Sequence, residues 1–454
     1  KYAEPNRGYF VKAGVNLMDW FAHPPYQAKK PTMFTELFTG GLGGPDAYAP
    51  MMGNLAYTPL GPFEGYERFF NWRMRAYREQ DVACFEPFEP FAYFRNFRPT
   101  ELFLKDYSRN VFSGESMQIK AVLLHGGFED REFQLVWHLE GADVRTRTVR
   151  LEPGHHVVEI PLSMPAVAKR TELAFSMWLL ADGKPVARWG RFDTTFKVFP
   201  RMKLNRRVAC WNVSEKAKAM LKAAGLEPVP VSDAAALGAF QLLFAQAPLF
   251  GTPAGATVAQ WVAGGGHAVI LASEDEAGKL PGGLKLSKFS NTQAHIAAPN
   301  HPVLKGLGST DFFHWAGGDH YVSHQAFLKP SGGAPKVLVE NGTTAGLPLA
   351  SLVEIQSGRG AYLVSSLLLS AKADREPVVG KLLDNIVAWA DGPKTPPGEA
   401  GLLVTDALQD YLFSENLIAD DLASVNVNPD DLSRYPLLVV DARVANADVG
   451  VLRQ

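Results

Sequence analysis

The pattern of apolar residues changes twice along this chain, and this change constrains the fold more than any other feature. Between residues 99 and 200, short stretches such as Leu173–Trp178 alternate apolar with polar side chains, which is typical of strands with one buried face. Between residues 203 and 392, continuous apolar runs such as His267–Ala272 alternate with helical patterns, which indicates a parallel sheet. One layered core does not suit both patterns, so the sequence predicts a multidomain protein with α/β and β parts.

Residues 99–200 are predicted to form an immunoglobulin-like β-sandwich. Asp182-Gly183 separates two of the apolar stretches and is a hairpin signal. The chain has two cysteines, Cys84 and Cys210, far apart in the sequence. Neither a disulfide framework nor a cysteine-based zinc site is therefore expected. We interpret this part as a spacer or brace.

Residues 203–392 are predicted to form a flavodoxin-like, doubly wound sheet. Arg207–Trp211 reads as its first strand, and Ser214 is placed to cap a helix over Glu215–Ala224. Glu376–Trp389 reads as the closing helix. Residues 398–454 repeat the order of extended segment, acidic turn, short helix and buried strand, which predicts the start of a second, truncated α/β domain.

Charge and composition exclude several classes of partner and cofactor. The formal net charge of −2 over 454 residues argues against nucleic-acid binding, and no apolar run reaches the ~18 residues of a membrane span. Gly264–Gly266 precedes a strand instead of following one, so no dinucleotide cofactor is expected. Cysteine usage fits the cytoplasm, the periplasm or secretion alike. Because the first and the last residues of the sequence both fall inside predicted domains, we expect the chain to belong to a longer protein.

The stretch Lys30–Phe38 ends an apolar run on one carboxylate, Glu36, and a glycine-rich segment follows. A strand that carries an acid to its C-terminal end and then opens into a loop is how a (β/α)8 barrel presents a catalytic group. A helical pattern over Gly65–Gln80 and a strand over Asp81–Phe85 continue this order. Residues 1–98 therefore predict the C-terminal part of a barrel, too short to close one of ~250 residues. The alternative is an ordinary exposed glutamate at a strand end.

The segment Pro31–Glu36 resembles the nucleophile strand of the retaining β-glycosidases built on (β/α)8 barrels, the β-galactosidase, β-glucuronidase and β-mannosidase group. The resemblance implies that Glu36 is the nucleophile and that the substrate is a carbohydrate. It also implies which residues line the sugar site: Trp20, His23, Tyr26 and Trp72. Glu86 and Glu89 lie where the rim of the barrel is expected, and Glu86 is predicted to bind the substrate.

Residues 203–392 resemble the glutamine-amidotransferase-like domain found in some β-galactosidases, through His301–Leu307 and Gly358–Ala361. The resemblance implies a role in subunit contact, so a homo-oligomer formed through this domain is expected. A glutaminase needs a cysteine nucleophile, and none follows Ala272, where the residues are Ser-Glu-Asp-Glu. The domain is therefore predicted not to be a glutaminase.

Three functional hypotheses follow. The first is a portion of a retaining β-glycosidase, whose second carboxylate is expected from an earlier strand because Glu4 lies in the wrong order for the acid signature. The second is a non-catalytic carbohydrate-binding or oligomerisation protein. The third is a small-molecule hydrolase acting through His314, His320 and His324, although their spacing matches no defined zinc site. The sequence leaves the sugar, the linkage and the compartment open, with the periplasm or secretion both compatible.

Overall fold

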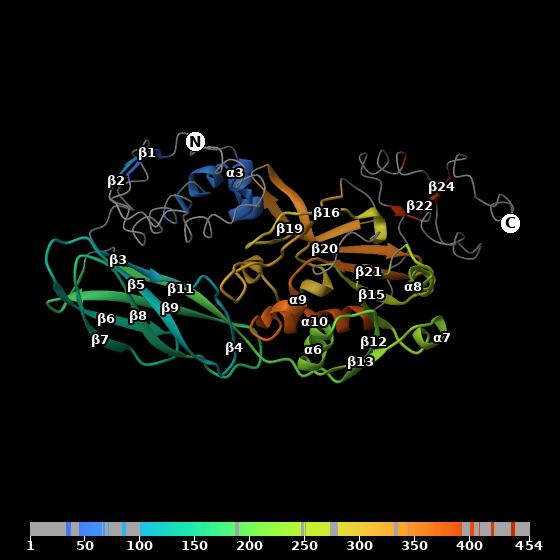
Figure 1. Ribbon diagram of the computed structural model, residues 1–454, viewed down its shortest axis with the longest axis horizontal. Coiled ribbons are helices and arrows are strands. Elements are labelled where there is room, and N and C mark those ends of the chain that lie inside the picture. Colours follow the sequence, from blue (N-terminus) through green and yellow to red (C-terminus); the bar gives the residue numbers. More distant parts are fainter. Residues whose placement is uncertain are drawn as a thin grey trace.

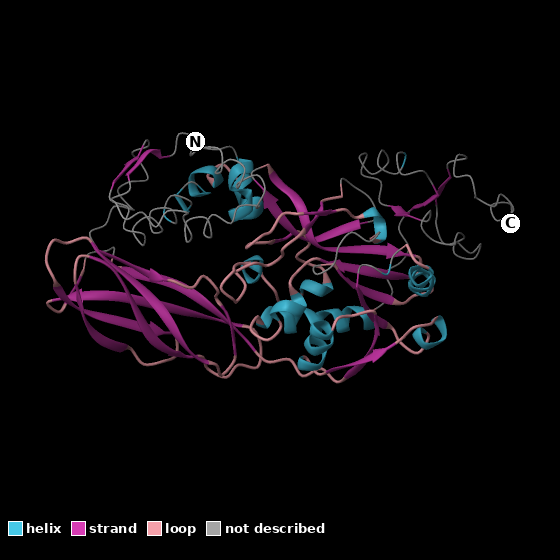
Figure 2. Cartoon of the chain, in the orientation of Figure 1, coloured by secondary structure: helices cyan, strands magenta, loops and turns pink. Residues whose placement is uncertain are grey.

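The structure of the chain is a computed structural model. It is mainly β-sheet with a few helices (Figure 2), as expected of a multidomain protein with α/β and β parts. In Figure 1 the β-sandwich occupies one end of the long axis and the α/β sheet lies beside it along that axis. The described residues are 33–37, 45–65, 67–68, 71, 84–87, 100–186, 190–246, 249, 251–272, 280–330, 335–343, 345–392, 400–403, 408, 419–421 and 437–440.

The β-sandwich is built from two sheets whose inner faces pack together. The alternating pattern predicted these strands: Phe133, Leu135, Phe175 and Met177 are buried at every second position. At the predicted hairpin, Asp182 and Gly183 have φ of 52° and 72°, the left-handed pair of a tight two-residue turn. One sheet has the order β3 (Thr100–Leu104), β5 (Ser116–His125), β8 (Gly154–Ser163). The other has the order β4 (Asn110–Phe112), β11 (Arg191–Phe199), β9 (Thr171–Ala181), β6 (Arg131–Leu139), β7 (Arg145–Leu151), with β10 (Lys184–Pro185) on β9.

The α/β part contains the parallel strands that the sequence predicted. Ser214 accepts a hydrogen bond from the Ala217 amide and begins the first helix, as expected of this N-cap. The parallel strands have the order β13 (Leu226–Pro230), β12 (Arg206–Trp211), β14 (Leu242–Gln246), β15 (His267–Leu271), β21 (Gly360–Ser365). The helices are α6 (Glu215–Ala223), α7 (Ala234–Leu237), α8 (Pro253–Ala263), α9 (Leu369–Lys372) and α10 (Pro377–Asp391).

An antiparallel extension continues this sheet beyond β21, and the sequence did not predict it. Its longest members, β19 (Pro335–Thr343) and β20 (Gly346–Ser357), form a hairpin. Polar residues such as Glu340, Asn341 and Glu354 are buried within these two strands, so the alternation that marks a strand is broken. The remaining members are β16 (Leu286–Ser287), β17 (His295–Ile296) and β18 (Ala326–Leu328).

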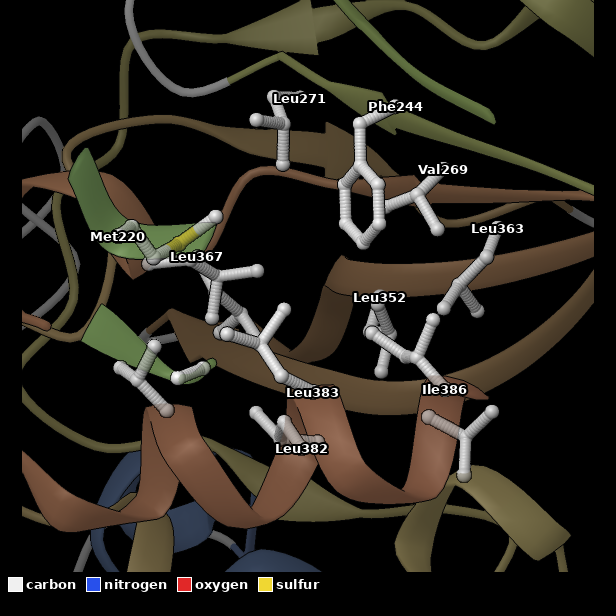
Figure 3. Close-up of a cluster of buried hydrophobic side chains, with 14 of the residues drawn as sticks. Met220, Phe244, Val269, Leu271, Leu352, Leu363, Leu367, Leu382, Leu383 and Ile386 are labelled. Carbon is white, nitrogen blue, oxygen red and sulfur yellow. The ribbon is translucent and has the colours of Figure 1, made fainter. Parts of the chain in front are cut away.

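The two faces of the parallel sheet pack against different helices. Successive side chains of a strand point to opposite faces. Phe244 therefore lies in one buried cluster with Met220 of α6 and Leu383 of α10, which Figure 3 shows. Its neighbour Leu243 packs on the other face with Val258 of α8. None of the described helices is both long and apolar enough to cross a membrane.

Strand β13 forms one edge of the α/β sheet and contains Pro228 and Pro230. Beyond its end, the Val231 amide donates to the Cys210 carbonyl of β12. Because consecutive amides alternate in direction, the nitrogens of the two prolines point away from β12.

Two smaller groups of elements flank these parts. At the N-terminal side, β1 (Met33–Leu37) and β2 (Cys84–Pro87) pair in parallel, and α3 (Pro45–Met52) and the 3₁₀ helix η1 (Gly53–Tyr57) lie between them in sequence. The predicted helix over 65–80 falls largely outside the described residues. At the C-terminal side the parallel order is β23 (Ala419–Asp421), β22 (Ala400–Leu403), β24 (Leu437–Val440), which repeats the order β13, β12, β14.

Candidate functional site

Glu36 and Glu86 lie on neighbouring parallel strands, β1 and β2. The register changes between them, so that Thr35 and Glu36 together lie opposite the single residue Glu86. The Cα pairs on either side of this bulge are Phe34 with Phe85 and Leu37 with Pro87. The backbone thus brings both predicted site residues to the C-terminal end of a parallel strand pair.

The other residues predicted for the sugar site are Trp20, His23, Tyr26 and Trp72. All four lie outside the described residues, as does Glu4, and their roles stay predictions.

A buried charge cluster joins the β-sandwich to the α/β part, and we call Arg170, Lys197 and Asp311 the interdomain cluster. Asp311 is fully buried, and both of its carboxylate oxygens accept hydrogen bonds from Arg170, at 2.8 Å and 2.7 Å. The ammonium group of Lys197 lies 3.6 Å from the same carboxylate. Burial lowers the pKa of Lys197 to about 8. Arg170 also donates to Glu172, and Lys197 donates to the Thr310 carbonyl. Every charged group of the cluster therefore has a partner, which suits a brace between domains.

A second buried carboxyl, Glu376, closes the same interface. Its oxygens accept hydrogen bonds from the side-chain amide of Asn110 in β4 and from the backbone amides of Ala316 and Val378. Burial raises the pKa of Glu376 to about 8, against the opposing effect of these donors. Asn110 also donates to the Asp311 carbonyl at 2.8 Å, so this one amide links both carboxyl-bearing residues to the sandwich.

The histidine-rich loop of the third hypothesis lies beside this interface. His314 and His320 both adopt left-handed backbone conformations, with φ of 49° and 53°, and their rings lie 6.3 Å apart. Tyr107 of the sandwich contacts both rings, at 5.5 Å and 5.9 Å. Within the described residues, no three His, Cys, Asp or Glu side chains are arranged to hold a metal ion. The contacts with Tyr107 show that the loop packs against the sandwich, and we assign it no catalytic or metal-binding role.

We predict that replacing His314 by asparagine weakens the acid sensitivity of the fold. Burial, the first cause, and nearby positive charges lower the pKa of His314 to about 3. Its Nε2 accepts from the Gln293 amide at 2.8 Å, an interaction that protonation would abolish. Between its unfolded pKa of ~6.5 and about 3, the unfolded chain binds a proton that the folded chain does not, so the free energy of unfolding falls as pH falls.

Asparagine accepts a left-handed backbone and does not titrate, so the His314→Asn protein should lose less stability between pH ~7 and pH ~5. Urea unfolding of both proteins at the two pH values measures the difference. Equal losses would mean that other groups account for the whole pH dependence.

Cys210 shows no sign of reactivity. It lies in β12 and is 3% exposed, and burial raises the pKa of its thiol to about 12. A nucleophilic cysteine requires the opposite shift, so this residue belongs to the core.

Sequence reasoning missed the interdomain cluster. Arg170 and Asp311 are separated by 141 positions, and no spacing or motif connects them. The histidines that follow Asp311 in the sequence suggested the hydrolase hypothesis instead of a contact between domains.

Comparisons with known proteins found only remote similarity. No family model matches the chain, and no curated protein matches it. Among solved structures, the β-galactosidase from Bacillus circulans sp. alkalophilus is 14% identical, with a TM-score of 0.27. The match covers 43% of this chain and 32% of that one, so it spans about a third of the β-galactosidase.

Two further solved structures match smaller parts of the chain. A CARDB domain from Pyrococcus furiosus is 12% identical over 22% of this chain and 89% of that domain, with a TM-score of 0.19. Native α2-macroglobulin from Escherichia coli is 16% identical over 23% of this chain and 7% of that one, with a TM-score of 0.20. Similarities at this level assign neither a fold nor a function to this chain.

Proposed function

We propose that this chain is a portion of a retaining β-glycosidase, β-galactosidase-like, that hydrolyses glycosidic bonds in oligo- or polysaccharides. In this proposal β1 and β2 are neighbouring strands of a (β/α)8 barrel, and residues 203–392 form an amidotransferase-like domain. Glu36 is the nucleophile, Glu86 binds the sugar, and Trp20, His23, Tyr26 and Trp72 line the sugar site.

The observation that carries the proposal is the parallel pairing of β1 with β2 across a helical connection. Parallel strands joined in this way form the repeating unit of α/β barrels, and in such barrels the catalytic residues lie at the C-terminal ends of the strands. Glu36 and Glu86 occupy that end of β1 and β2. The likeness of Pro31–Glu36 to the glycosidase nucleophile strand supports the same assignment.

The chemistry requires two carboxyl groups. The Glu36 carboxylate attacks the anomeric carbon while an acid protonates the departing glycosidic oxygen, which leaves a covalent glycosyl–Glu36 ester. The same acid, now a base, removes a proton from water, and the water oxygen displaces Glu36 from the anomeric carbon. A neighbouring carboxylate such as Glu86 accepts hydrogen bonds from sugar hydroxyls, which orients the ring for attack.

Trapping the covalent intermediate tests the proposal. The full-length protein that contains this chain is incubated with 2,4-dinitrophenyl 2-deoxy-2-fluoro-β-glycosides of galactose, glucose and mannose. The fluorine slows both formation and release of the ester, and the activated leaving group keeps formation the faster step, so the ester accumulates. We expect one fluoroglycosyl adduct by intact mass, located by peptide mapping on the peptide that contains Glu36. An adduct on a different carboxylate would overturn the residue assignment. Hydrolysis of aryl glycosides without any adduct would overturn the retaining mechanism.

A further inference from the structure

We propose that the β19–β20 hairpin of the α/β part, together with β17 paired to it, holds in place the segment that follows the Glu36 strand. His295 and Gly342 are the positioning residues in this proposal. The segment in question is α3 with η1, residues 45–57, and we call it the rim segment. The inference rests on the proposed function, because it assigns the α/β part a role in the same reaction.

His295 fixes the C-terminal end of α3. Its side chain is 5% exposed, and its Nε2 donates a hydrogen bond to the Pro50 carbonyl at 3.0 Å. Burial lowers the pKa of His295, so the neutral ring makes this contact. A Cβ atom on Gly53 would lie 2.6 Å from the ring, closer than such atoms can approach. The ring therefore fits only because the chain turns out of α3 at a glycine.

Gly342 allows β19 to approach α3 directly. A Cβ atom added to Gly342 would lie 2.5 Å from the Pro50 Cα and 2.7 Å from the Pro50 nitrogen. The backbone of Gly342 lies outside the left-handed region, so any residue could adopt its conformation. The close approach of the rim segment is the physical reason for a glycine here.

Polar contacts surround this close approach. Asn54 of the rim segment donates to Glu340 of β19 at 3.4 Å, and Lys329 donates to the other Glu340 oxygen at 2.6 Å. Glu340 is 2% exposed, and these two donors compensate its buried charge. Tyr57 donates to Asp46 at 2.9 Å, which ties the two ends of the rim segment together beside the hairpin.

The position of this contact gives it a functional consequence. The rim segment begins at Pro45, shortly after Leu37 ends β1, so in the proposed barrel it belongs to the connection that follows the Glu36 strand. In α/β barrels the loops at this end of the strands build the active site. A displacement of about 1 Å there can cost about 10²-fold in rate. A contact made by the α/β part should therefore influence the chemistry on β1.

A glycine-to-alanine pair tests the proposal in the full-length protein. Gly342→Ala inserts a methyl group into the contact with Pro50, whereas Gly318→Ala places one where no atom lies within 4 Å. We expect kcat on aryl β-glycosides to fall at least ~10-fold for Gly342→Ala, with KM little changed, and both to stay at wild-type values for Gly318→Ala. Hydrogen–deuterium exchange of peptides from 45–57 should rise in Gly342→Ala alone, while β12 and β14 stay protected.

A second pair separates positioning from folding. His295→Gln keeps a donor that can reach the Pro50 carbonyl, whereas His295→Ala removes it, so glutamine should restore part of the lost kcat and the lost protection. If Gly342→Ala does not fold, the same exchange measurement is made on Asn54→Ala. This variant deletes only a hydrogen bond at the edge of the contact. Wild-type kcat and unchanged exchange in the folded variant would overturn the proposal.

The exchange measurement also separates this inference from the proposed function. If the fluoroglycoside labels no glutamate but exchange over 45–57 rises, the positioning contact stands and the glycosidase assignment fails. If Glu36 is labelled and exchange does not change, the glycosidase assignment stands and the positioning role fails.

Discussion

Replacement of Glu36 by alanine should abolish hydrolysis, with kcat lower by about 10⁴- to 10⁶-fold, the range seen when other enzymes lose a covalent nucleophile. Without the carboxylate no glycosyl ester forms, while the acid that protonates the leaving group is untouched. The missing side chain also leaves space for a small anion. Added azide should therefore restore turnover by attacking the anomeric carbon itself, and it should yield an α-glycosyl azide from a β-glycoside, detectable by NMR.

Glu64→Gln provides the matched control, because Glu64 is an exposed carboxylate farther along the same part of the chain. We expect it to keep wild-type kcat and to show no response to azide. If the Glu36→Ala protein kept more than about a tenth of the wild-type activity, Glu36 would be an ordinary strand-end glutamate. That result would favour the hypothesis of a non-catalytic carbohydrate-binding or oligomerisation protein.

Replacement of Asp311 by asparagine should destabilise the protein by about 3–5 kcal/mol, the usual cost of removing one partner from a buried ion pair. Arg170 donates to both oxygens of this fully buried carboxylate, and Lys197 lies close to it. The amide cannot neutralise these cations, and its NH₂ group would point toward a donor. Urea unfolding monitored by tryptophan fluorescence measures the loss.

The control for this change is Asp182→Asn, in the exposed pair with Arg131, whose side chains are 88% and 52% exposed. Surface pairs of this kind contribute about 0–1 kcal/mol, and asparagine tolerates the left-handed backbone at this turn. A loss at Asp311 as small as that at Asp182 would show that the two domains do not depend on the interdomain cluster.

The parallel half of the α/β sheet could be predicted from the sequence because its strands are uniform apolar runs. The run His267–Ala272 became β15, and the N-cap at Ser214 identified the start of α6. The β19–β20 hairpin escaped prediction because Glu340 and Glu354 are buried within it and interrupt the apolar pattern.

The candidate site, too, could be predicted only in part. Local order along the chain was enough to predict a strand that ends near Glu36 and a second strand close to Glu86, and β1 and β2 contain these two residues. The contact of His295 with Pro50 spans 245 positions, and it depends on Gly53 and Gly342 lacking a side chain. Such a contact is set by tertiary packing and leaves no periodic trace in the sequence. The interdomain cluster was missed for the same reason.

The proline pair in β13 has a consequence for how copies of this protein can associate. An edge strand normally offers a row of outward amide hydrogens that an incoming strand can use. At Pro228 and Pro230 the outward nitrogens carry no hydrogen, so a strand from another molecule would find acceptors but few donors along β13. Pairing of β13 with a strand of another molecule is therefore disfavoured, which lowers the tendency of this sheet to aggregate edge to edge. An oligomer formed through the α/β part should instead use its helical faces or the opposite edge at β16.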